Sequence, residues 1–519
     1  MLFRSGREGH PTQINKFYTV SLEGGLPEAV DIPRAAYGEI DADGSHIAYT
    51  PITSWDPEWR NYRGGQAMPI WIVDMETKEL IRTPQPDRER HLDPVWYDDK
   101  VYYLSERDYA SNIWLFDPAT REEKQLTTHK QFDVKSLDAG PDAIIYEQGG
   151  YLHLLDPETG ASEPVNIHVR GDMNFARPRW EEVSADELSN PNISPSGKRA
   201  IFEYRGELFT IPKEDGSWRN LTHSPGVADR YPVWSPQGDQ IAWFSDESGD
   251  YQLLIADQMG QHQRSIALPN PTFYFRPDWS PDGQYIALTD TDYNIWVVDV
   301  ERGKDKEVDT DRYAHPNRAM NPVWSPDSKW IAYARQLESH FKAAFAYNVE
   351  TEERIQLTDG MADVITPVWD QSGQYLYFLA STDYGLNSGW LDMSSYDPDV
   401  NRSLYCMLLT KDLESPAKVK SDEEEVEAEE DKEAEDEEKE DGVVVRIDQE
   451  GLMQRIVALD LPAQNYLGLW AGPANTVFVA ESIPNQSGAT LHKYDLNEQK
   501  AEEFVKGVRE GVTSFDGSH

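Results

Sequence analysis

The sequence YPVWSPQGDQIAWFS, at Tyr231–Ser245, occurs again in altered form at 276–290, 321–335 and 366–380. The later copies read RPDWSPDGQYIALTD, NPVWSPDSKWIAYAR and TPVWDQSGQYLYFLA, and their tryptophans follow one another at intervals of 45 residues. A fixed period of about 40–50 residues is typical of a four-stranded propeller blade. The repeat therefore predicts an all-β chain built from consecutive propeller blades.

Each copy has the same internal order. A proline, Pro232 in the first copy, stands before the expected inner strand, where a missing N–H is tolerated. The sequence Ser-Pro-Asp-Gly at 280–283 predicts a turn, because proline presets φ and glycine supplies a positive φ. The apolar run that follows predicts a second strand, and a third strand should end in an acidic residue, as at Ile295–Asp299.

Weaker copies of the unit extend back to the first residue and forward to about 496, with a break in rhythm at 169–190. We therefore expect two consecutive β-propellers with a boundary near Ala185. Residues 1–185 are predicted to form a six-bladed ring that lacks its first blade or blades. Residues 186–519 are predicted to form a seven-bladed ring that lacks most of its last blade. Residues 512–519 read as the first strand of that blade, so the sequence predicts a piece of a longer polypeptide.

The chain is strongly acidic, with 93 Asp and Glu against 48 Lys and Arg and a formal net charge of −45. This charge argues against nucleic acid and anionic membrane surfaces as partners. The block SDEEEVEAEEDKEAEDEEKED, at 421–441, repels itself and predicts a disordered loop over about 415–445. A single cysteine, Cys406, excludes an internal disulfide and is interpreted as a packing residue.

Several stretches resemble the tricorn protease family. They include LFRSGREGHP at 2–11, EWRNYRGGQAMPIWI at 58–72, GPDAIIYEQGGYLHLLDPETG at 140–160 and VRIDQEGLMQRIVALDLPAQNY at 445–466. The resemblance covers essentially the whole chain. It implies the gating and channel propellers of a cytoplasmic, hexameric serine peptidase that degrades oligopeptides downstream of the proteasome or similar proteases. A periplasmic location stays open, because the true N-terminus is expected to be missing.

The resemblance places the PDZ-like and catalytic domains of the family beyond the second propeller, so no catalytic residue can be assigned and the chain itself is expected to be inactive. The segment Gly385–Gly389 does not fit a nucleophile elbow, whose serine must be central. The sequence contains no His-Glu-x-x-His motif and no glycine-rich phosphate loop, so neither a metal nor a cofactor is predicted.

Family members anchor the C-terminal carboxylate of a substrate with arginines of the six-bladed propeller. Arg60 and Arg63, flanked by Trp59 and Tyr62 in the insertion at 54–67, are the candidate substrate-binding residues. Packing of the insertion on a neighbouring blade is the structural alternative for them. Two other functions remain open for the chain: a non-enzymatic Tol-type scaffold for protein–protein interaction, and the propeller lid of a prolyl-oligopeptidase-like enzyme.

Overall fold

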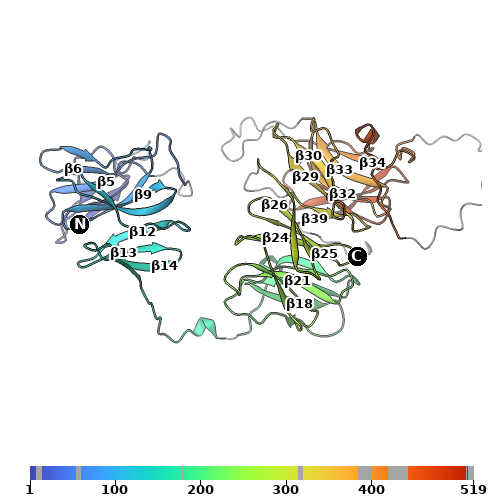
Figure 1. The fold of residues 1–519 in the computed structure, drawn as a ribbon, viewed down its shortest axis with the longest axis horizontal. Helices are drawn as coiled ribbons and strands as arrows, with labels where there is room; N and C mark the ends of the chain where they lie inside the picture. Colours follow the sequence, from blue (N-terminus) through green and yellow to red (C-terminus); the bar gives the residue numbers. More distant parts are fainter. Residues whose placement is uncertain are drawn as a thin grey trace, which may run out of the picture. The chain divides into compact units, whose positions relative to one another are not determined.

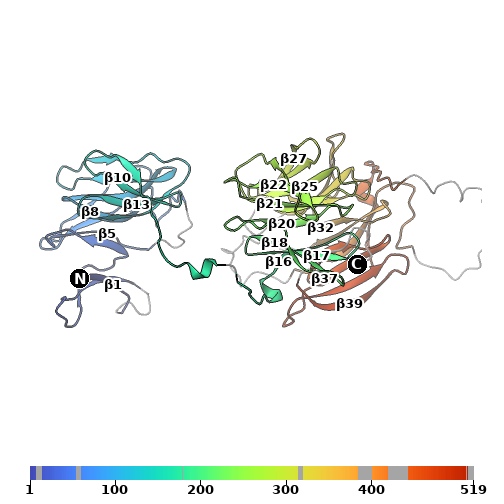
Figure 2. The same cartoon turned by 90° about the horizontal axis from the view of Figure 1, so that it is seen from below.

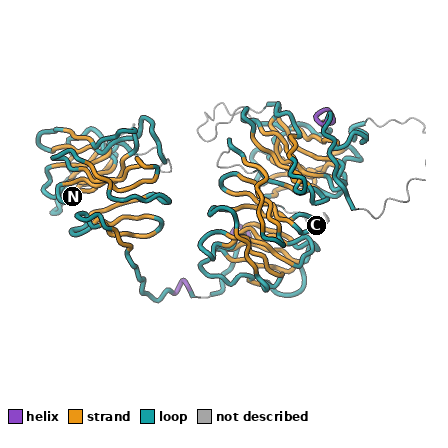
Figure 3. The backbone as a smooth tube through the Cα atoms, viewed as in Figure 1, coloured by secondary structure: helices purple, strands orange, loops and turns teal. Residues whose placement is uncertain are grey.

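The computed structural model describes residues 1–7, 14–53, 60–177, 179–313, 320–383, 400–418, 442–509 and 511. The chain divides into two compact units, Met1–Pro178 (unit 1) and Arg179–His519 (unit 2), each built almost wholly from strands (Figures 1 and 3). The predicted boundary residue Ala185 lies in the short 3-10 helix η2 (Ala185–Glu187), just before the first strand of unit 2.

Unit 1 contains one three-stranded and three four-stranded antiparallel sheets, taken in chain order. Its strands are β1 (Leu2–Ser5), β2 (Lys16–Thr19), β3 (Glu28–Ala29); β4 (Tyr37–Ile40), β5 (His46–Thr50), β6 (Trp71–Asp74), β7 (Leu80–Arg82); β8 (His91–Tyr97), β9 (Lys100–Asp108), β10 (Ala110–Phe116), β11 (Glu123–Gln125); and β12 (Val134–Ala139), β13 (Ile144–Gln148), β14 (Tyr151–Leu155), β15 (Ser162–Pro164). A 3-10 helix, η1 (Asn174–Ala176), follows the last sheet.

Unit 2 contains six four-stranded antiparallel sheets within its described residues. Their strands are β16 (Ser189–Ile193), β17 (Arg199–Tyr204), β18 (Glu207–Pro212), β19 (Arg219–Asn220); β20 (Arg230–Trp234), β21 (Gln240–Ser245), β22 (Gln252–Asp257), β23 (Arg264–Ala267); β24 (Tyr274–Trp279), β25 (Tyr285–Asp290), β26 (Asn294–Asp299), β27 (Lys304–Thr310); β28 (Val323–Trp324), β29 (Trp330–Gln336), β30 (Lys342–Asn348), β31 (Arg354–Gln356); β32 (Asp363–Trp369), β33 (Tyr375–Ser381), β34 (Ser403–Leu408), β35 (Ile456–Ala458); and β36 (Tyr466–Ala471), β37 (Thr476–Glu481), β38 (Ala489–Asp495), β39 (Lys500–Val508). A 3-10 helix, η5 (Leu452–Arg455), precedes β35.

The sheets of each unit are arranged as propeller blades, with the first strand of each four-stranded sheet innermost. In unit 1, β4 lies beside β8 and β8 beside β12; in unit 2, β16, β20, β24, β28, β32 and β36 follow one another in the same way. Figure 2 shows the stacked sheets of both units in a second view. The all-β propeller fold predicted from the repeat is confirmed. The six- and seven-bladed ring sizes stay predictions.

Each seam between consecutive sheets has a hydrophobic core of its own. In the described part of the chain, eight separate clusters of buried side chains fill three seams in unit 1 and five in unit 2. The tryptophans that mark the repeat, Trp234, Trp279, Trp324 and Trp369, all lie in these clusters. Cys406 is fully buried in the last of them, between the sheets β32–β35 and β36–β39. Alternating strand residues therefore pack on the two neighbouring sheets.

Pro322 stands directly before the inner strand β28, as the sequence predicts. The prolines of the other three copies, Pro232, Pro277 and Pro367, lie inside β20, β24 and β32, which corrects the expectation for those copies. β20 and β24 begin upstream of Pro232 and Pro277, and their ladders are interrupted there by a bulge. The residue before the proline takes a left-handed backbone, with φ of 54° at Tyr231. The strand therefore continues through the proline, whose missing N–H falls where the ladder is already broken.

The acidic block lies outside the described residues, as do Gly385–Gly389 and 512–519. The chain is described again from 442, where Val445 is buried in the core beside β32 and donates its backbone N–H to Asp327 Oδ2 at 2.9 Å. Beyond the acidic block, β35 pairs with β34 and completes the four strands of the interrupted sheet. Among the described residues, no helix combines the length and apolar composition needed to cross a membrane.

Candidate functional site

The two predicted substrate-binding residues lie on the connection between β5 and β6 of unit 1, at one end of the sheets. Arg60 makes a paired contact with the Asp133 carboxylate, with Nε 2.7 Å from Oδ2 and Nη2 2.9 Å from Oδ1. Its guanidinium also lies over the ring of Tyr109 at 5.3 Å. Arg60 therefore already has the kind of bidentate partner that a substrate carboxylate would provide. Trp59 lies outside the described residues.

Arg63 is placed differently. Its Nη2 donates to the backbone carbonyl oxygen of Glu106 at 2.9 Å and its Nη1 to that of Tyr62 at 3.4 Å. The side chain is half-buried, and no carboxylate lies within ion-pair distance of it in the described part of the chain. Because a guanidinium carries five N–H donors, Arg63 keeps donors for an added anion.

A second arginine holds the residue to which Arg63 is bonded. Arg90 Nη2 lies 2.6 Å from Glu106 Oε1, and both side chains are more than nine-tenths buried. A buried ion pair of this kind is worth little compared with an apolar pair, but removing one member is costly because the other charge is then left unpaired. The Arg90–Glu106 pair therefore fixes the end of β9. The backbone carbonyl group of Glu106 in turn holds the side chain of Arg63.

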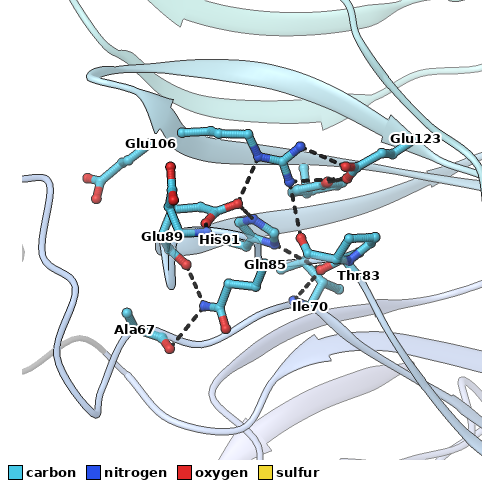
Figure 4. A network of polar contacts seen from close by, with 12 residues as sticks. Ala67, Ile70, Thr83, Gln85, Glu89, His91, Glu106 and Glu123 are labelled. Carbon is cyan, nitrogen blue, oxygen red and sulfur yellow. Dashed lines mark hydrogen bonds and ion pairs between the residues drawn. The ribbon is translucent and has the colours of Figure 1, made fainter.

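The base of the β5–β6 connection is held by a buried polar network of Thr83, Gln85, Glu89, His91, Arg107 and Glu123, which we call the Glu89 network (Figure 4). Gln85 donates its amide N–H to the Ala67 carbonyl oxygen at 3.1 Å and to that of Glu89. The backbone N–H of Ile70 donates to Thr83 Oγ1 at 3.0 Å. These bonds anchor the C-terminal end of the insertion that carries Arg60 and Arg63.

Glu89 and Arg107 form the charged centre of the Glu89 network. Arg107 Nε donates to Glu89 Oε1 at 2.8 Å, and Arg107 Nη1 donates to Glu123 Oε1 at 2.7 Å. Burial by itself would raise the pKa of Glu89, but hydrogen bonds from His91, backbone N–H groups and Arg107 outweigh burial and lower that pKa to about 2. Glu89 is therefore an anion at neutral pH, although its side chain is fully buried.

His91 is neutral in this network. Burial lowers its pKa, and the hydrogen bond and charge of Glu89 only partly offset that effect. The ionised Glu89 carboxylate, 3.4 Å from His91 Nε2, can only accept a hydrogen bond, so it favours the tautomer with the proton on Nε2. Nδ1 then accepts the hydroxyl proton of Thr83 Oγ1 at 2.8 Å. The Thr83 hydroxyl is bonded on both sides, so it is a structural group and not a nucleophile.

The arrangement can therefore position guanidinium groups at one end of unit 1. Its polar groups are hydrogen-bonded to one another, which fits a structural role better than a catalytic one. Arg60 and Arg63 stay predicted substrate-binding residues, whereas Arg90, Glu106 and the Glu89 network were not predicted from the sequence as parts of the site. Only the dense charge of RERHLD at 88–93 and SERD at 105–108 could have pointed to them.

The geometry defines the class of protein. The chain has two propeller units, and unit 1 carries arginines on the connections at one end of its sheets. Residues 1–161 match the tricorn protease N-terminal beta propeller domain, and residues 188–519 match the tricorn protease second beta propeller domain. The chain therefore belongs to the tricorn protease family.

Relatives agree with this assignment. The chain is 22% identical over 471 residues to the tricorn protease homolog of Saccharolobus solfataricus. The match covers 89% of this chain and 41% of the relative. The chain thus spans less than half the length of that relative. The crystal structure of the tricorn protease matches 99% of the chain and 54% of its own, with a TM-score of 0.53 and 15% identity, which supports the fold. The Tol-Pal system protein TolB of Francisella tularensis matches 43% of the chain at 24% identity.

Proposed function

We propose that this chain forms the substrate-gating and channel propellers of a tricorn-like serine peptidase that acts on oligopeptides. The observation that carries the proposal is the order of the two matches, an N-terminal propeller at 1–161 followed by the second propeller at 188–519, on a single chain. A Tol-type scaffold is less well supported, because the TolB match covers less than half of the chain.

In this proposal, peptide hydrolysis belongs to a catalytic domain outside the 519 residues, and the propellers select what reaches it. A narrow entrance admits extended peptides and excludes folded proteins. The bond would be cleaved by a serine nucleophile with an oxyanion hole, which splits one acyl transfer into two easier steps. Cytoplasmic location, hexameric assembly, a PDZ-like partner domain and the six- and seven-bladed rings belong to the same proposal.

Arg63 is the better of the two candidates for binding the peptide in unit 1. Arg60 is paired with Asp133, whereas the partners of Arg63 among the described residues are carbonyl oxygens, and Arg63 is held in place by the Arg90–Glu106 pair. An incoming carboxylate would accept N–H bonds from Arg63 without displacing an internal anion. We expect Arg60 to orient the β5–β6 connection by its bond to Asp133.

The proposal is tested on the purified 519-residue chain with two measurements. First, fluorogenic peptide amides should not be hydrolysed, and turnover that stays with the protein through successive purification steps would contradict the absence of a catalytic centre. Second, fluorescence anisotropy should detect binding of unstructured octapeptides but not of a small folded protein that contains the same sequence. Equal binding of both would reject a gating function.

Arg63→Gln should weaken the binding of a peptide with a free C-terminus, by about tenfold if one charged hydrogen-bonded pair is lost. Arg121→Gln is the matched control, because Arg121 is largely exposed on a turn of the neighbouring sheet, with only a 4.0 Å contact to Glu79. An unchanged affinity in the Arg63 variant would assign that residue to packing alone.

A further inference from the structure

An open cavity of about 700 Å³ in unit 2 is bordered by the inner strands and the last sheet. Three of the residues that line it, Arg276, Asn321 and Thr366, occupy the same position of the repeat, directly before the proline, and follow one another by 45 residues. They come from three adjacent blades, so the repeat itself places them in a row along the cavity wall.

The backbone of this row is strained in the same way at each position. The φ angles are 49° at Arg276, 45° at Asn321 and 44° at Thr366. Asparagine tolerates this left-handed region, but a β-branched threonine there is a clear outlier, which costs about 1–3 kcal/mol. Strain of this kind persists where the surrounding structure enforces it, and it concentrates at binding sites. The same left-handed backbone occurs at Tyr231, so it belongs to the bulge of the inner strands, and the three residues at this position in the later copies of the repeat line the cavity.

The row keeps polar groups without internal partners. Arg276 donates Nη1–H to Asn321 Oδ1 at 2.8 Å, which is a neutral acceptor, and no carboxylate of the described residues lies within ion-pair distance of its guanidinium. Thr366 Oγ1 is a buried atom that has no hydrogen-bond partner in the same part of the chain. A buried hydroxyl without a partner costs about 1–3 kcal/mol, so an acceptor supplied by a ligand would be favourable.

The charge of the cavity is opposite to that of the protein. Its described lining includes two arginines, Arg276 and Arg509, and no aspartate or glutamate, in a chain with 93 acidic residues. Arg509 is already 3.1 Å from Asp186, which leaves Arg276 as the cation without an anionic partner among the described lining residues. Facing the row are apolar side chains, among them Leu467 and Leu469.

We propose that this cavity binds a carboxylate of a peptide, with the Arg276 guanidinium as its anchor and the Thr366 hydroxyl, once a rotation of its side chain exposes it, as a second donor. The apolar wall takes the side chain next to that carboxylate. The inference rests on the proposed passage of peptides through the propellers, and adds the chemistry that unit 2 selects. The same carboxylate can come from an acidic side chain or from the peptide C-terminus.

The test uses the 519-residue chain and rhodamine-labelled octapeptides in anisotropy titrations. The parent peptide carries leucines, two glutamates and a free C-terminus. Three others replace the glutamates by glutamines, amidate the C-terminus, or do both. The protein variants are Arg276→Gln, Arg276→Lys and Thr366→Val. Arg302→Gln serves as the control, because Arg302 is exposed on a turn and does not line the cavity.

Arg276→Gln should weaken binding of the parent peptide about tenfold, with a smaller loss for Arg276→Lys, which keeps the charge but not the planar fork. Thr366→Val should weaken it severalfold, and Arg302→Gln should leave it unchanged. Whichever peptide change abolishes the Arg276 effect identifies the source of the carboxylate. Parent binding that is the same in Arg276→Gln would overturn this inference and leave peptide gating intact. No binding of any peptide to any form would overturn both.

Discussion

Trp324 donates its Nε1–H to the backbone carbonyl oxygen of Asp278 at 3.0 Å, across the seam between β28 and β24. Trp369 repeats this bond one blade later, to the carbonyl oxygen of Val323 at 3.1 Å. In these two copies the tryptophan that marks the 45-residue period therefore joins neighbouring inner strands as well as filling the core. The indole N–H of Trp234 is different, because it is buried and has no partner among the described residues.

This difference gives a matched pair of variants. Trp324→Phe and Trp234→Phe remove the same volume from similar buried sites, but only the first breaks a hydrogen bond. We expect Trp324→Phe to reduce the free energy of unfolding by about 1 kcal/mol more than Trp234→Phe does. Urea denaturation followed by circular dichroism measures both values. Equal losses would show that the bond adds nothing to stability.

Gly260 ends a turn where a Cβ atom would meet backbone. Its φ is +76°, and an added Cβ would lie 2.5 Å from the Leu221 carbonyl oxygen. Gly226 has a similar φ of +85° with no atom within 4 Å of the added Cβ. Gly226→Ala should therefore lower the free energy of unfolding by about 1 kcal/mol, from backbone strain alone. Gly260→Ala should lower it by about 3 kcal/mol, because the added Cβ atom also meets the backbone of Leu221. Thermal unfolding of both variants tests the prediction, and a cost for Gly226→Ala as large as that for Gly260→Ala would contradict it.

Asp278 should make the protein less stable as the pH rises. Burial raises the pKa of Asp278 to about 7, from an ordinary value near 4. The folded protein holds this proton more tightly than the unfolded chain does, so ionisation of Asp278 lowers the free energy of unfolding. This loss of stability is fully present above pH 7 and disappears as the pH falls toward 4. Asp278→Asn should stabilise the protein by about 2 kcal/mol at pH 8, and not at pH 4.

Urea unfolding at several pH values checks this result, with Asp305→Asn on the exposed strand β27 as the control. A gain for Asp278→Asn that does not change with pH would show that titration of this carboxyl group is not its cause.

Glu89 should have the opposite effect. Its pKa is lowered to about 2, so its ionised form stabilises the fold above pH 4.5, and this contribution is lost as the pH falls toward 2. Glu89→Gln removes the buried anion that pairs with Arg107, so it should lower the free energy of unfolding by about 3 kcal/mol at pH 7. Below pH 4.5 the difference in stability between the variant and the parent protein should be smaller. Hydrogen exchange of peptides from β9 reports on unit 1. Exchange as slow as in Glu79→Gln, an exposed control, would argue against the ionic role of Glu89.

Much of the fold could be predicted from the sequence because a propeller repeats local chemistry. The second strand after the turn at 280–283 and the third strand ending at Asp299 were predicted from apolar runs and turns, and both are confirmed as β25 and β26. Three of the four repeated prolines lie inside the inner strand, whereas the sequence predicts them before it. A bulge is not visible in a two-residue period, and Tyr231 gives no sign of the left-handed backbone that it adopts.

The candidate site was much harder to predict, because its contacts join residues far apart in the chain. Arg60 reaches Asp133 across 73 residues, and Arg63 donates to the Glu106 carbonyl oxygen across 43. No spacing rule links such pairs. Arg276 was accessible in principle, since aligning the four copies places it beside Tyr231, Asn321 and Thr366. Its importance depends on the cavity, which only the three-dimensional structure shows.

The separate core at each seam has an evolutionary consequence. Duplication or loss of one 45-residue segment would add or remove a single seam, and the side chains of the remaining seams would keep their neighbours. Damage from a point substitution should likewise stay within two adjacent blades. Such a lineage can change its number of blades by whole repeats while each surviving wedge keeps the chemistry that it had before.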